Sequence, residues 1–128
     1  MTAAAIPEGY HSVMPYLLVN DAARALDYYT RVFGATERLR FDAPGGKIGH
    51  AEFEIGDSLL MLADVEPAVE ARDGSNAGIH PIHLMCYVAD VDQVFQQALA
   101  SGAKVIRPVQ DQFYGDRSGT LVDPFGHM

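Results

Sequence analysis

The sequence carries one structural pattern twice, and this repeat constrains the fold more than any other feature. Asp21 and Asp90 lie 69 residues apart, and each follows a short apolar run and precedes a stretch with helical spacing. Three further glycine pairs keep nearly the same offset, of 68, 70 and 70 residues: Gly34 and Gly102, Gly49 and Gly119, Gly56 and Gly126. A period this long in a chain of 128 residues indicates two copies of one supersecondary unit.

Each copy is predicted to be a β-α-β-β-β module, so the fold class is α+β. In the first module, residues 12–64, we expect a strand at 12–19, a helix from Asp21 to Gly34, and strands at 36–42, 47–55 and 58–63. In the second, residues 80–128, we expect a strand at 82–88, a helix from Asp90 to Gly102, and strands at 104–107 and 116–122. Residues 1–11 are interpreted as a loose leader and residues 65–79 as a linker.

The final strand of the second module is expected to begin at His127 and Met128, where the sequence stops. Two alternatives follow. The chain is truncated at this point, or another chain completes the sheet edge. Residues 12–128 are otherwise expected to form one domain, because each half alone is too short to bury a good core.

Composition and charge exclude several classes of function. The formal net charge of −8 argues against nucleic acid, whose phosphates require a basic surface. No apolar run approaches the length of a membrane span, and the first ten residues do not look like a signal peptide. The single cysteine, Cys86, excludes an internal disulfide, so the cytoplasm is the expected compartment.

Three segments resemble the vicinal oxygen chelate superfamily, which contains glyoxalase I, bleomycin-resistance proteins and extradiol dioxygenases. They are residues 28–35, residues 50–58, and residues 111–119 with 123–127; the last is similar to the glyoxalase-like branch named after a phosphonate-operon protein. The resemblance implies curled mixed sheets around a cavity, a homodimer and, in enzymes, a divalent metal held by His and Glu. One such scaffold hosts many functions.

The same resemblance implies four metal-ligand positions, and most of them lack a ligand here. His83 occupies one position, Met14 and Leu60 occupy two others, and the fourth lies beyond the last residue. Thioether and alkyl groups do not hold Mg²⁺, Mn²⁺ or Zn²⁺. We therefore expect no metal cofactor, and a divalent metal at His83 is the alternative.

Strand alternation predicts which side chains line the cavity. Met14, Tyr16 and Leu18 share one face of the first strand, and Val13, Leu17 and Val19 share the face under the helix. In the second module, His83, Met85 and Tyr87 should face the cavity, and Leu84, Cys86 and Val88 the helix. His50 and Glu52 alternate with apolar residues and could meet His83 in a metal or acid–base site; a solvated strand face is the alternative.

We therefore expect a metal-independent protein that binds a small, partly aromatic molecule, with antibiotic resistance as a conceivable role. Tyr114 could stack on a ring of the ligand, and Arg117 could anchor an anion or brace its own turn. The alternatives are a metal-dependent glyoxalase-type lyase or dioxygenase centred on His83, and a module whose site has decayed. The candidate ligand-binding residues are Met14, Tyr16, His50, Glu52, Leu60, His83, Met85, Tyr87, Tyr114 and Arg117.

Overall fold

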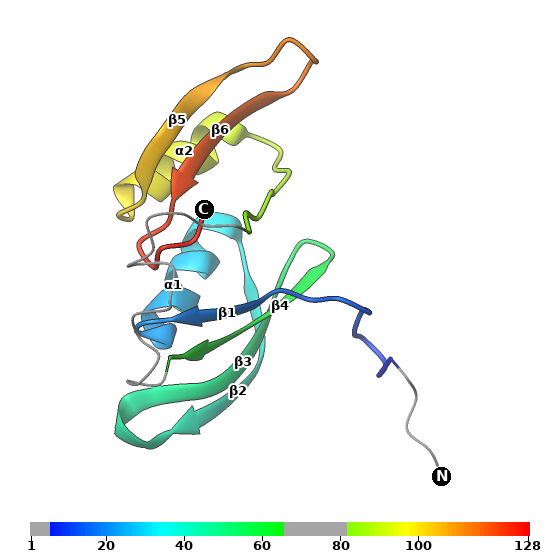
Figure 1. Cartoon of the computed structure of the whole chain (residues 1–128), viewed down its shortest axis with the longest axis vertical. Coiled ribbons are helices and arrows are strands. Elements are labelled where there is room, and N and C mark those ends of the chain that lie inside the picture. Colours follow the sequence, from blue (N-terminus) through cyan, green and yellow to red (C-terminus); the bar gives the residue numbers. More distant parts are fainter. Residues whose placement is uncertain (1–5, 66–81) are drawn as a thin grey trace. The chain divides into compact units, whose positions relative to one another are not determined.

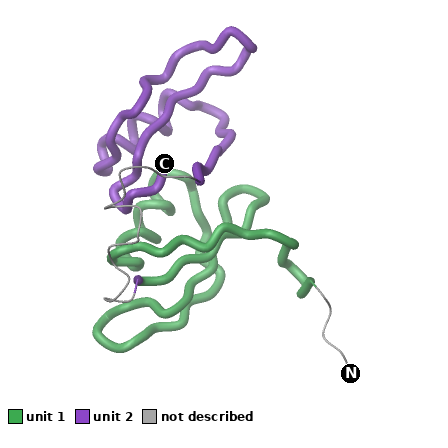
Figure 2. The backbone as a smooth tube through the Cα atoms, viewed as in Figure 1, with its two compact units in different colours: residues 1–64 green, residues 65–128 purple. Residues whose placement is uncertain are grey.

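The computed structural model of the chain describes residues 6–65 and 82–128 (Figure 1). The chain divides into two compact units, residues 1–64 and residues 65–128 (Figure 2). The boundary between the units falls at the end of the first predicted module. The linker predicted at 65–79 lies, apart from Val65, outside the described residues.

The first unit is a four-stranded mixed sheet with one helix, which confirms the predicted β-α-β-β-β order. Strand β1 pairs in parallel with β4, and β4–β3 and β3–β2 are antiparallel, so the sheet order is β1-β4-β3-β2 (Figure 1). The elements are β1 (Tyr16–Val19), α1 (Ala22–Phe33), β2 (Thr36–Ala43), a 3₁₀ turn (Pro44–Gly46), β3 (Lys47–Ile55) and β4 (Ser58–Asp64).

Helix α1 covers one face of this sheet. Its N-cap Asp21 accepts a hydrogen bond from the Arg24 backbone N–H at 3.3 Å, and Gly34 ends it in the left-handed conformation, as predicted. The Tyr29 ring stacks on Phe53 of β3, with 5.5 Å between ring centroids. The side chains of β1, β3 and β4 that face the helix are buried; they are Leu17, Val19, Ala51, Phe53, Leu60 and Leu62. Within the described residues of the first unit, no helix covers the other face, which we call the open face.

Strand β1 is shorter than predicted, beginning at Tyr16 instead of Ser12. Pro15 precedes it and has no N–H to donate, although its carbonyl still accepts a hydrogen bond from the Met61 N–H at 3.0 Å. Leu17 and Val19 are buried under α1, as predicted, whereas Val13 is exposed because it lies before the paired segment.

The second unit contains helix α2 (Val91–Ala100), capped by Asp90, and the antiparallel strands β5 (Lys104–Asp111) and β6 (Arg117–Val122). Strand β5 extends four residues beyond its predicted end. The loop expected at 108–115 is correspondingly shorter, because these residues pair with the start of β6. With two helices and mixed sheets, the chain belongs to the α+β class.

Two predicted strands of the second unit do not form. Residues 82–88 are not in a strand, and Leu84 and Cys86, predicted to pack under the helix, are exposed. In the first unit the equivalent strand β1 is held by β4. Among the described residues of the second unit, the Leu84 N–H donates to the Met128 carbonyl at 3.0 Å, and no strand pairs with residues 82–88.

Neither helix of the described residues is long enough to cross a membrane; α1 has 12 residues and α2 has 10.

Candidate functional site

The open face of the first unit's sheet brings together side chains from all four strands. In the register of the sheet, Tyr16 of β1 lies beside Met61 of β4, and Met61 lies opposite Glu52 of β3. Residues paired in this way present their side chains on the same face. His50, two residues before Glu52, shares this face and lies opposite Phe41 of β2.

Four of the polar side chains form a continuous hydrogen-bonded chain, Tyr10–Glu52–His50–Tyr16. The Tyr10 hydroxyl donates to Oε1 of Glu52 at 2.6 Å, and Nε2 of His50 lies 2.8 Å from Oε2 of the same carboxylate. The Tyr16 hydroxyl lies 2.8 Å from Nδ1 of His50. Both carboxylate oxygens and both ring nitrogens are thereby engaged, which is the usual condition for a polar group to be tolerated in a buried place.

Glu52 is the buried member of this chain, with 6% of its surface exposed. Burial alone raises the pKa of a carboxyl group, but the hydrogen bonds from Tyr10 and His50 outweigh it, so the pKa of Glu52 lies below its ordinary value. Glu52 is therefore a carboxylate at neutral pH. Because a carboxylate only accepts hydrogen bonds, Nε2 of His50 must carry the proton it shares with Glu52.

The two tyrosines respond in the opposite direction. The hydrogen bond to Glu52 and burial raise the pKa of Tyr10. Burial and the negative charge of Glu52 raise the pKa of Tyr16. Both phenols are therefore protonated at neutral pH, and with a neutral His50 the Tyr16 hydroxyl donates to Nδ1. Tyr16 is half-exposed, with 46% of its surface accessible.

Aromatic rings surround His50. The Phe41 ring stacks on His50 with 6.3 Å between centroids, and the Tyr16 ring lies at 5.5 Å with a tilt of 40°. Phe41 and Leu18 are also exposed on this face. An imidazole between two rings on an apolar sheet face suits a flat organic ligand better than a hydrated one.

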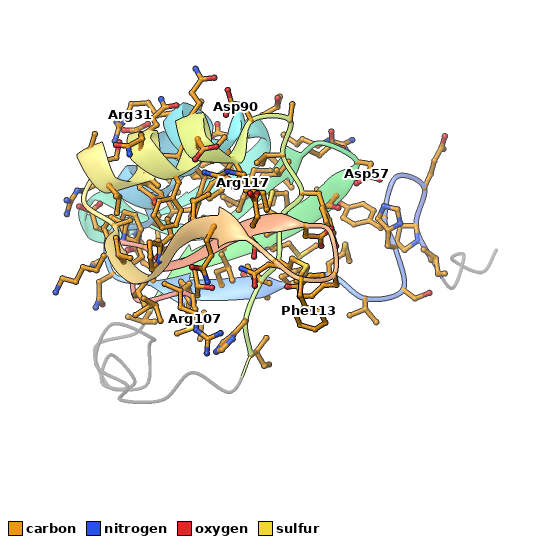
Figure 3. All side chains as sticks on the ribbon, turned by 90° about the horizontal axis from the view of Figure 1, so that it is seen from above. Arg31, Asp57, Asp90, Arg107, Phe113 and Arg117 are labelled. Atoms are coloured by element: carbon orange, nitrogen blue, oxygen red, sulfur yellow. The ribbon has the colours of Figure 1, made fainter. Side chains whose placement is uncertain are left out.

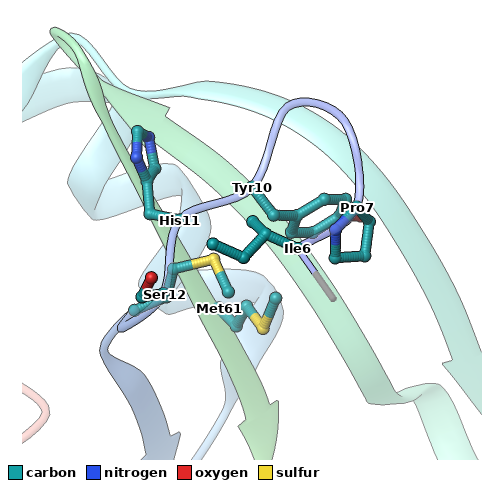
Figure 4. Close-up of a pocket in the computed structure, with 7 residues that line it drawn as sticks. Ile6, Pro7, Tyr10, His11, Ser12 and Met61 are labelled. Atoms are coloured by element: carbon teal, nitrogen blue, oxygen red, sulfur yellow. The ribbon is translucent and has the colours of Figure 1, made fainter. Parts of the chain in front are cut away.

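A pocket of about 570 Å³ lies beside the hydrogen-bonded chain (Figure 4). It is formed where the segment before β1 passes over Met61, and Tyr10 belongs both to the pocket wall and to the hydrogen bond with Glu52. This volume falls within the range of small-molecule sites, roughly 300–1,000 Å³. Its lining is mostly apolar: Ile6, Pro7, Tyr10, His11, Ser12, Met14 and Met61.

The predicted residues of the first unit divide between the two faces of the sheet. Tyr16, His50 and Glu52 come together on the open face, and Met14 lines the pocket. Leu60 does not reach this face. It lies opposite Phe53, which stacks on α1, and Leu60 is buried beneath the same helix. Its neighbour Met61 takes the open-face position.

The predicted residues of the second unit are exposed. His83, Met85 and Tyr87 lie in the unpaired segment, and Tyr114 packs edge-on against Phe113 in the loop between β5 and β6 (Figure 3). The predicted meeting of His83 with His50 would join the two units and stays a prediction. Arg117, which is labelled in Figure 3, forms ion pairs with Asp92 of α2 and Asp111 of β5.

Arg117 is held by two carboxylates. Its guanidinium donates two hydrogen bonds to Asp92 of α2, at 2.9 and 3.0 Å, and one to Asp111 of β5 at 3.1 Å. The hydrogen bonds from Arg117 lower the pKa of Asp92, and those to Asp92 and Asp111 raise the pKa of Arg117. An anionic ligand would therefore have to compete with two carboxylates for this side chain.

The donors on the open face do not fit a divalent metal. Met14 and Met61 offer thioethers, and both nitrogens of His50 and both oxygens of Glu52 already hold hydrogen bonds. Among residues 6–65 and 82–128, no group of three or more His, Cys, Asp or Glu side chains is placed to hold a metal ion.

Tyr10 is the functional residue that sequence reasoning missed. The sequence predicts a loose leader at residues 1–11. In the structure, four of the residues that line the pocket come from residues 6–11, and one of them, Tyr10, donates the hydrogen bond to Glu52. The contact joins residues 42 positions apart, so no local pattern could reveal it. The only available signal was an aromatic pair, Tyr10 and His11, directly before an apolar strand.

Comparison with known proteins establishes the class of protein that carries this fold and site. Residues 9–128 match the model of the Glyoxalase/Bleomycin resistance protein/Dioxygenase superfamily, and the chain belongs to that superfamily. An uncharacterized protein from Mycobacterium tuberculosis H37Rv is 40% identical over 119 residues, which cover 91% of this chain and 70% of the relative.

Solved structures share the fold. TioX from Micromonospora sp. ML1 is 34% identical, with a TM-score of 0.67, and the match covers 91% of this chain and 90% of TioX. A protein from Pseudomonas aeruginosa is 26% identical, with a TM-score of 0.72 and 91% and 92% covered. The fosfomycin resistance protein FosX from Mesorhizobium loti, at 21% identity, a TM-score of 0.65 and 91% and 86% covered, is similar in fold alone.

Proposed function

We propose that this protein binds a small, partly aromatic organic molecule without a metal cofactor. The observation that carries the proposal is the pocket of about 570 Å³ beside the exposed rings of the open sheet face. The rings of Phe41 and Tyr16 supply flat apolar surface next to His50, and Met14 and Met61 supply thioethers that adapt to varied shapes. The bound molecule would lie between these two surfaces.

The biological role that we propose for such binding is sequestration of a toxic compound, as in antibiotic resistance. The superfamily that matches this chain includes bleomycin resistance proteins by description, and FosX is a fosfomycin resistance protein with the same fold. A sequestering protein requires affinity and no catalysis. It therefore does not need metal ligands at the expected positions, where Met14 and Leu60 are apolar. The net charge of −8 favours a cationic compound over an anionic one.

Titration with the planar cationic dye proflavine, followed by fluorescence, tests the proposal. We expect saturable binding that is unchanged after dialysis against EDTA. Removing the Met61 side chain with Met61→Ala takes apolar contact from both the pocket and the sheet face. At about 25 cal/mol per Å² of apolar area, this loss should weaken binding roughly five- to tenfold. Naphthalene sulfonate, a flat anion, should bind more weakly than proflavine.

The matched control is Phe113→Ala, which removes a fully exposed ring in the second unit that lies outside the pocket. If Phe113→Ala weakens binding as much as Met61→Ala, the dye adheres to exposed rings in general and the proposed pocket is wrong. Metal analysis of the same purified protein addresses the alternative function. A stoichiometric divalent metal, together with loss of binding in EDTA, would overturn the proposal in favour of the metal-dependent lyase or dioxygenase.

A further inference from the structure

The hydrogen bonds place His50 between Tyr16 and Glu52, which is the order that a proton relay requires. Glu52 is buried, His50 bridges it to Tyr16, and Tyr16 reaches the open face. Both links measure 2.8 Å, within hydrogen-bonding distance for proton transfer. A nucleophile or acid, a base and a carboxylate that orients the base form the arrangement by which proteins activate hydroxyl groups.

The orientation of the histidine is fixed from the buried end. Glu52 is ionised, so it holds the proton on Nε2 and leaves Nδ1 as the free acceptor that faces the Tyr16 hydroxyl. When Nδ1 takes the Tyr16 proton, the imidazolium that results lies 2.8 Å from a carboxylate in a partly buried place, where opposite charges attract strongly. The buried carboxylate thus favours transfer of the proton away from Tyr16.

We propose that Tyr16, His50 and Glu52 form a metal-independent proton-transfer site, in which Tyr16 exchanges a proton with the bound molecule and His50 serves as the base for Tyr16. Tyr16 is the catalytic residue that touches the substrate, and Glu52 is a positioning residue. This activity goes beyond binding, and it rests on the proposed binding function because the reacting molecule is the bound one.

The chemical class of substrate is a flat, conjugated carbonyl compound with an acidic C–H bond next to the carbonyl. The Tyr16 oxygen takes the proton of that C–H bond while its own proton passes to Nδ1 of His50. The electron pair of the broken C–H bond moves onto the carbonyl oxygen and gives an enolate. Return of the proton, to the same carbon or to a conjugated one, completes an isomerisation that needs no oxidant, reductant or further reactant.

A purely structural role for the hydrogen-bonded chain makes a different prediction. The Tyr10–Glu52 link joins the segment before β1 to the sheet and accounts for the burial of Glu52 by itself. It does not require His50 to present an acceptor to a half-exposed tyrosine. If the chain serves only to fix the segment, Tyr16 should react as an ordinary or a hindered phenol.

Reaction with phenylmethanesulfonyl fluoride, read by peptide mass spectrometry, distinguishes these cases without a known substrate. The Tyr16 oxygen attacks sulfur, the S–F bond breaks, fluoride leaves with the electron pair, and the proton passes to Nδ1 of His50. The internal controls are Tyr87 and Tyr114, which are more exposed than Tyr16, at 81% and 61%. We expect Tyr16 to be modified at least about tenfold faster than either, a threshold set below the roughly 10²–10⁴-fold that a general base contributes.

Simple ionisation predicts the reverse order, so the outcome is decisive. Burial and the Glu52 charge raise the pKa of Tyr16, which lowers its phenolate fraction and slows any reaction that lacks a base. Tyr16 reacting no faster than Tyr87 and Tyr114 would overturn the proposal.

Variants then assign the roles. His50→Phe and Glu52→Gln should each reduce the Tyr16 rate to that of Tyr114, and Glu52→Asp should restore part of it. Glu54→Gln removes a carboxylate of the same strand that pairs with Arg38 and takes no part in the relay, and it should leave the Tyr16 rate within about twofold of the wild type. Rates are compared for variants that remain folded by circular dichroism. A rate that survives in His50→Phe, or that falls equally in Glu54→Gln, would contradict the relay.

Discussion

The buried carboxylate of Glu52 makes the stability of the fold depend on pH. Its pKa is lower in the folded protein than in the unfolded chain, despite burial, because Tyr10 and His50 donate hydrogen bonds to it. A group with a lowered pKa stabilises the fold above its unfolded pKa, about 4.3, and this contribution is lost as the pH falls through the folded pKa. Glu52→Gln should therefore destabilise the protein by about 1–3 kcal/mol at pH 7. The difference should shrink toward pH 3, as measured by urea unfolding.

The control for this prediction is Glu54→Gln, two residues along the same strand. Glu54 pairs with Arg38 at the surface, and its side chain is 39% exposed, so its loss should cost little at any pH. A pH-independent effect of Glu52→Gln would mean that its hydrogen bonds do not depend on the charge.

Gly119 is required by packing rather than by backbone conformation. A Cβ atom added at this position would lie 2.7 Å from Cε1 of Phe95 and 2.9 Å from Cγ2 of Val109. Gly119→Ala should therefore destabilise the protein by about 1–3 kcal/mol through overpacking, measured by thermal or urea unfolding. The repeat supplies the matched control, Gly49→Ala, where the nearest atoms lie at an ordinary 3.6 Å. Equal effects of the two substitutions would rule out the packing argument.

At the scale of elements, local patterns predicted helices well and strand pairing poorly. The apolar spacing and caps of α1 and the alternation of β3 lie entirely within one segment, and both elements have the predicted character and bounds. Residues 82–88 carry the same kind of apolar run as β1 but form no strand, since a strand depends on a partner elsewhere in the chain. Propensity alone therefore predicted a strand at 82–88 that the structure does not contain.

The candidate site was predictable in the same way: local patterns were informative, and contacts between distant residues were not. The alternation of His50 and Glu52 with apolar residues placed both on one face, and that face is the open one. Strand alternation also placed Tyr16 on the cavity face, but not its hydrogen bond to His50, which joins residues 34 positions apart. Two residues could not be read from spacing: Tyr10 meets Glu52 across 42 residues, and Met61 replaces Leu60 on the open face through the register of β4.

Asp64 links two elements of the first unit through one carboxylate. Its Oδ1 accepts a hydrogen bond from the Ala22 N–H at the start of α1, at 2.9 Å, and its Oδ2 accepts one from the Ile48 N–H of β3, at 2.7 Å. Asp64→Asn turns one acceptor into a donor that faces an N–H group. We expect it to destabilise the protein by about 1–3 kcal/mol in urea unfolding. Asp57→Asn, in the exposed turn before β4, is the control and should have little effect.

Hydrogen exchange tests whether β1 and residues 82–88, the two equivalent apolar segments of the repeat, differ in strand pairing. The amides of β1 lie in a parallel ladder with β4, whereas within the described part of the chain the Leu84 N–H is the backbone donor of residues 82–88. Mass spectrometry after transfer to heavy water should show residues 82–88 exchanging much faster than residues 17–19. Equal protection of the two segments would contradict this difference in pairing.

At the scale of the whole molecule, the two copies of the sequence repeat do not form the same set of helices and strands in the described residues. The first unit completes a four-stranded sheet, and the described part of the second unit has a helix and a two-stranded hairpin. The described part of the second unit exposes several large apolar side chains. Those of residues 82–87 that are large and exposed are Ile82, Leu84, Met85 and Tyr87. Contiguous exposed apolar surface of this kind is typical of an interface.

The exposed apolar side chains of residues 82–87 predict a homodimer. The affinity of the two chains for each other should increase with salt concentration. Each chain carries a net charge of −8, so two copies repel each other, and salt screens that repulsion. Apolar contacts are not weakened by salt in the same way. Sedimentation should therefore show tighter dimers at about 300 mM salt than at about 30 mM, where the screening length is several-fold longer. Met85→Asp adds a charge within the apolar segment and should shift the protein to monomer. A protein that is monomeric at every salt concentration would contradict the dimer, and one that dissociates as salt is added would show that charge pairs hold the dimer instead.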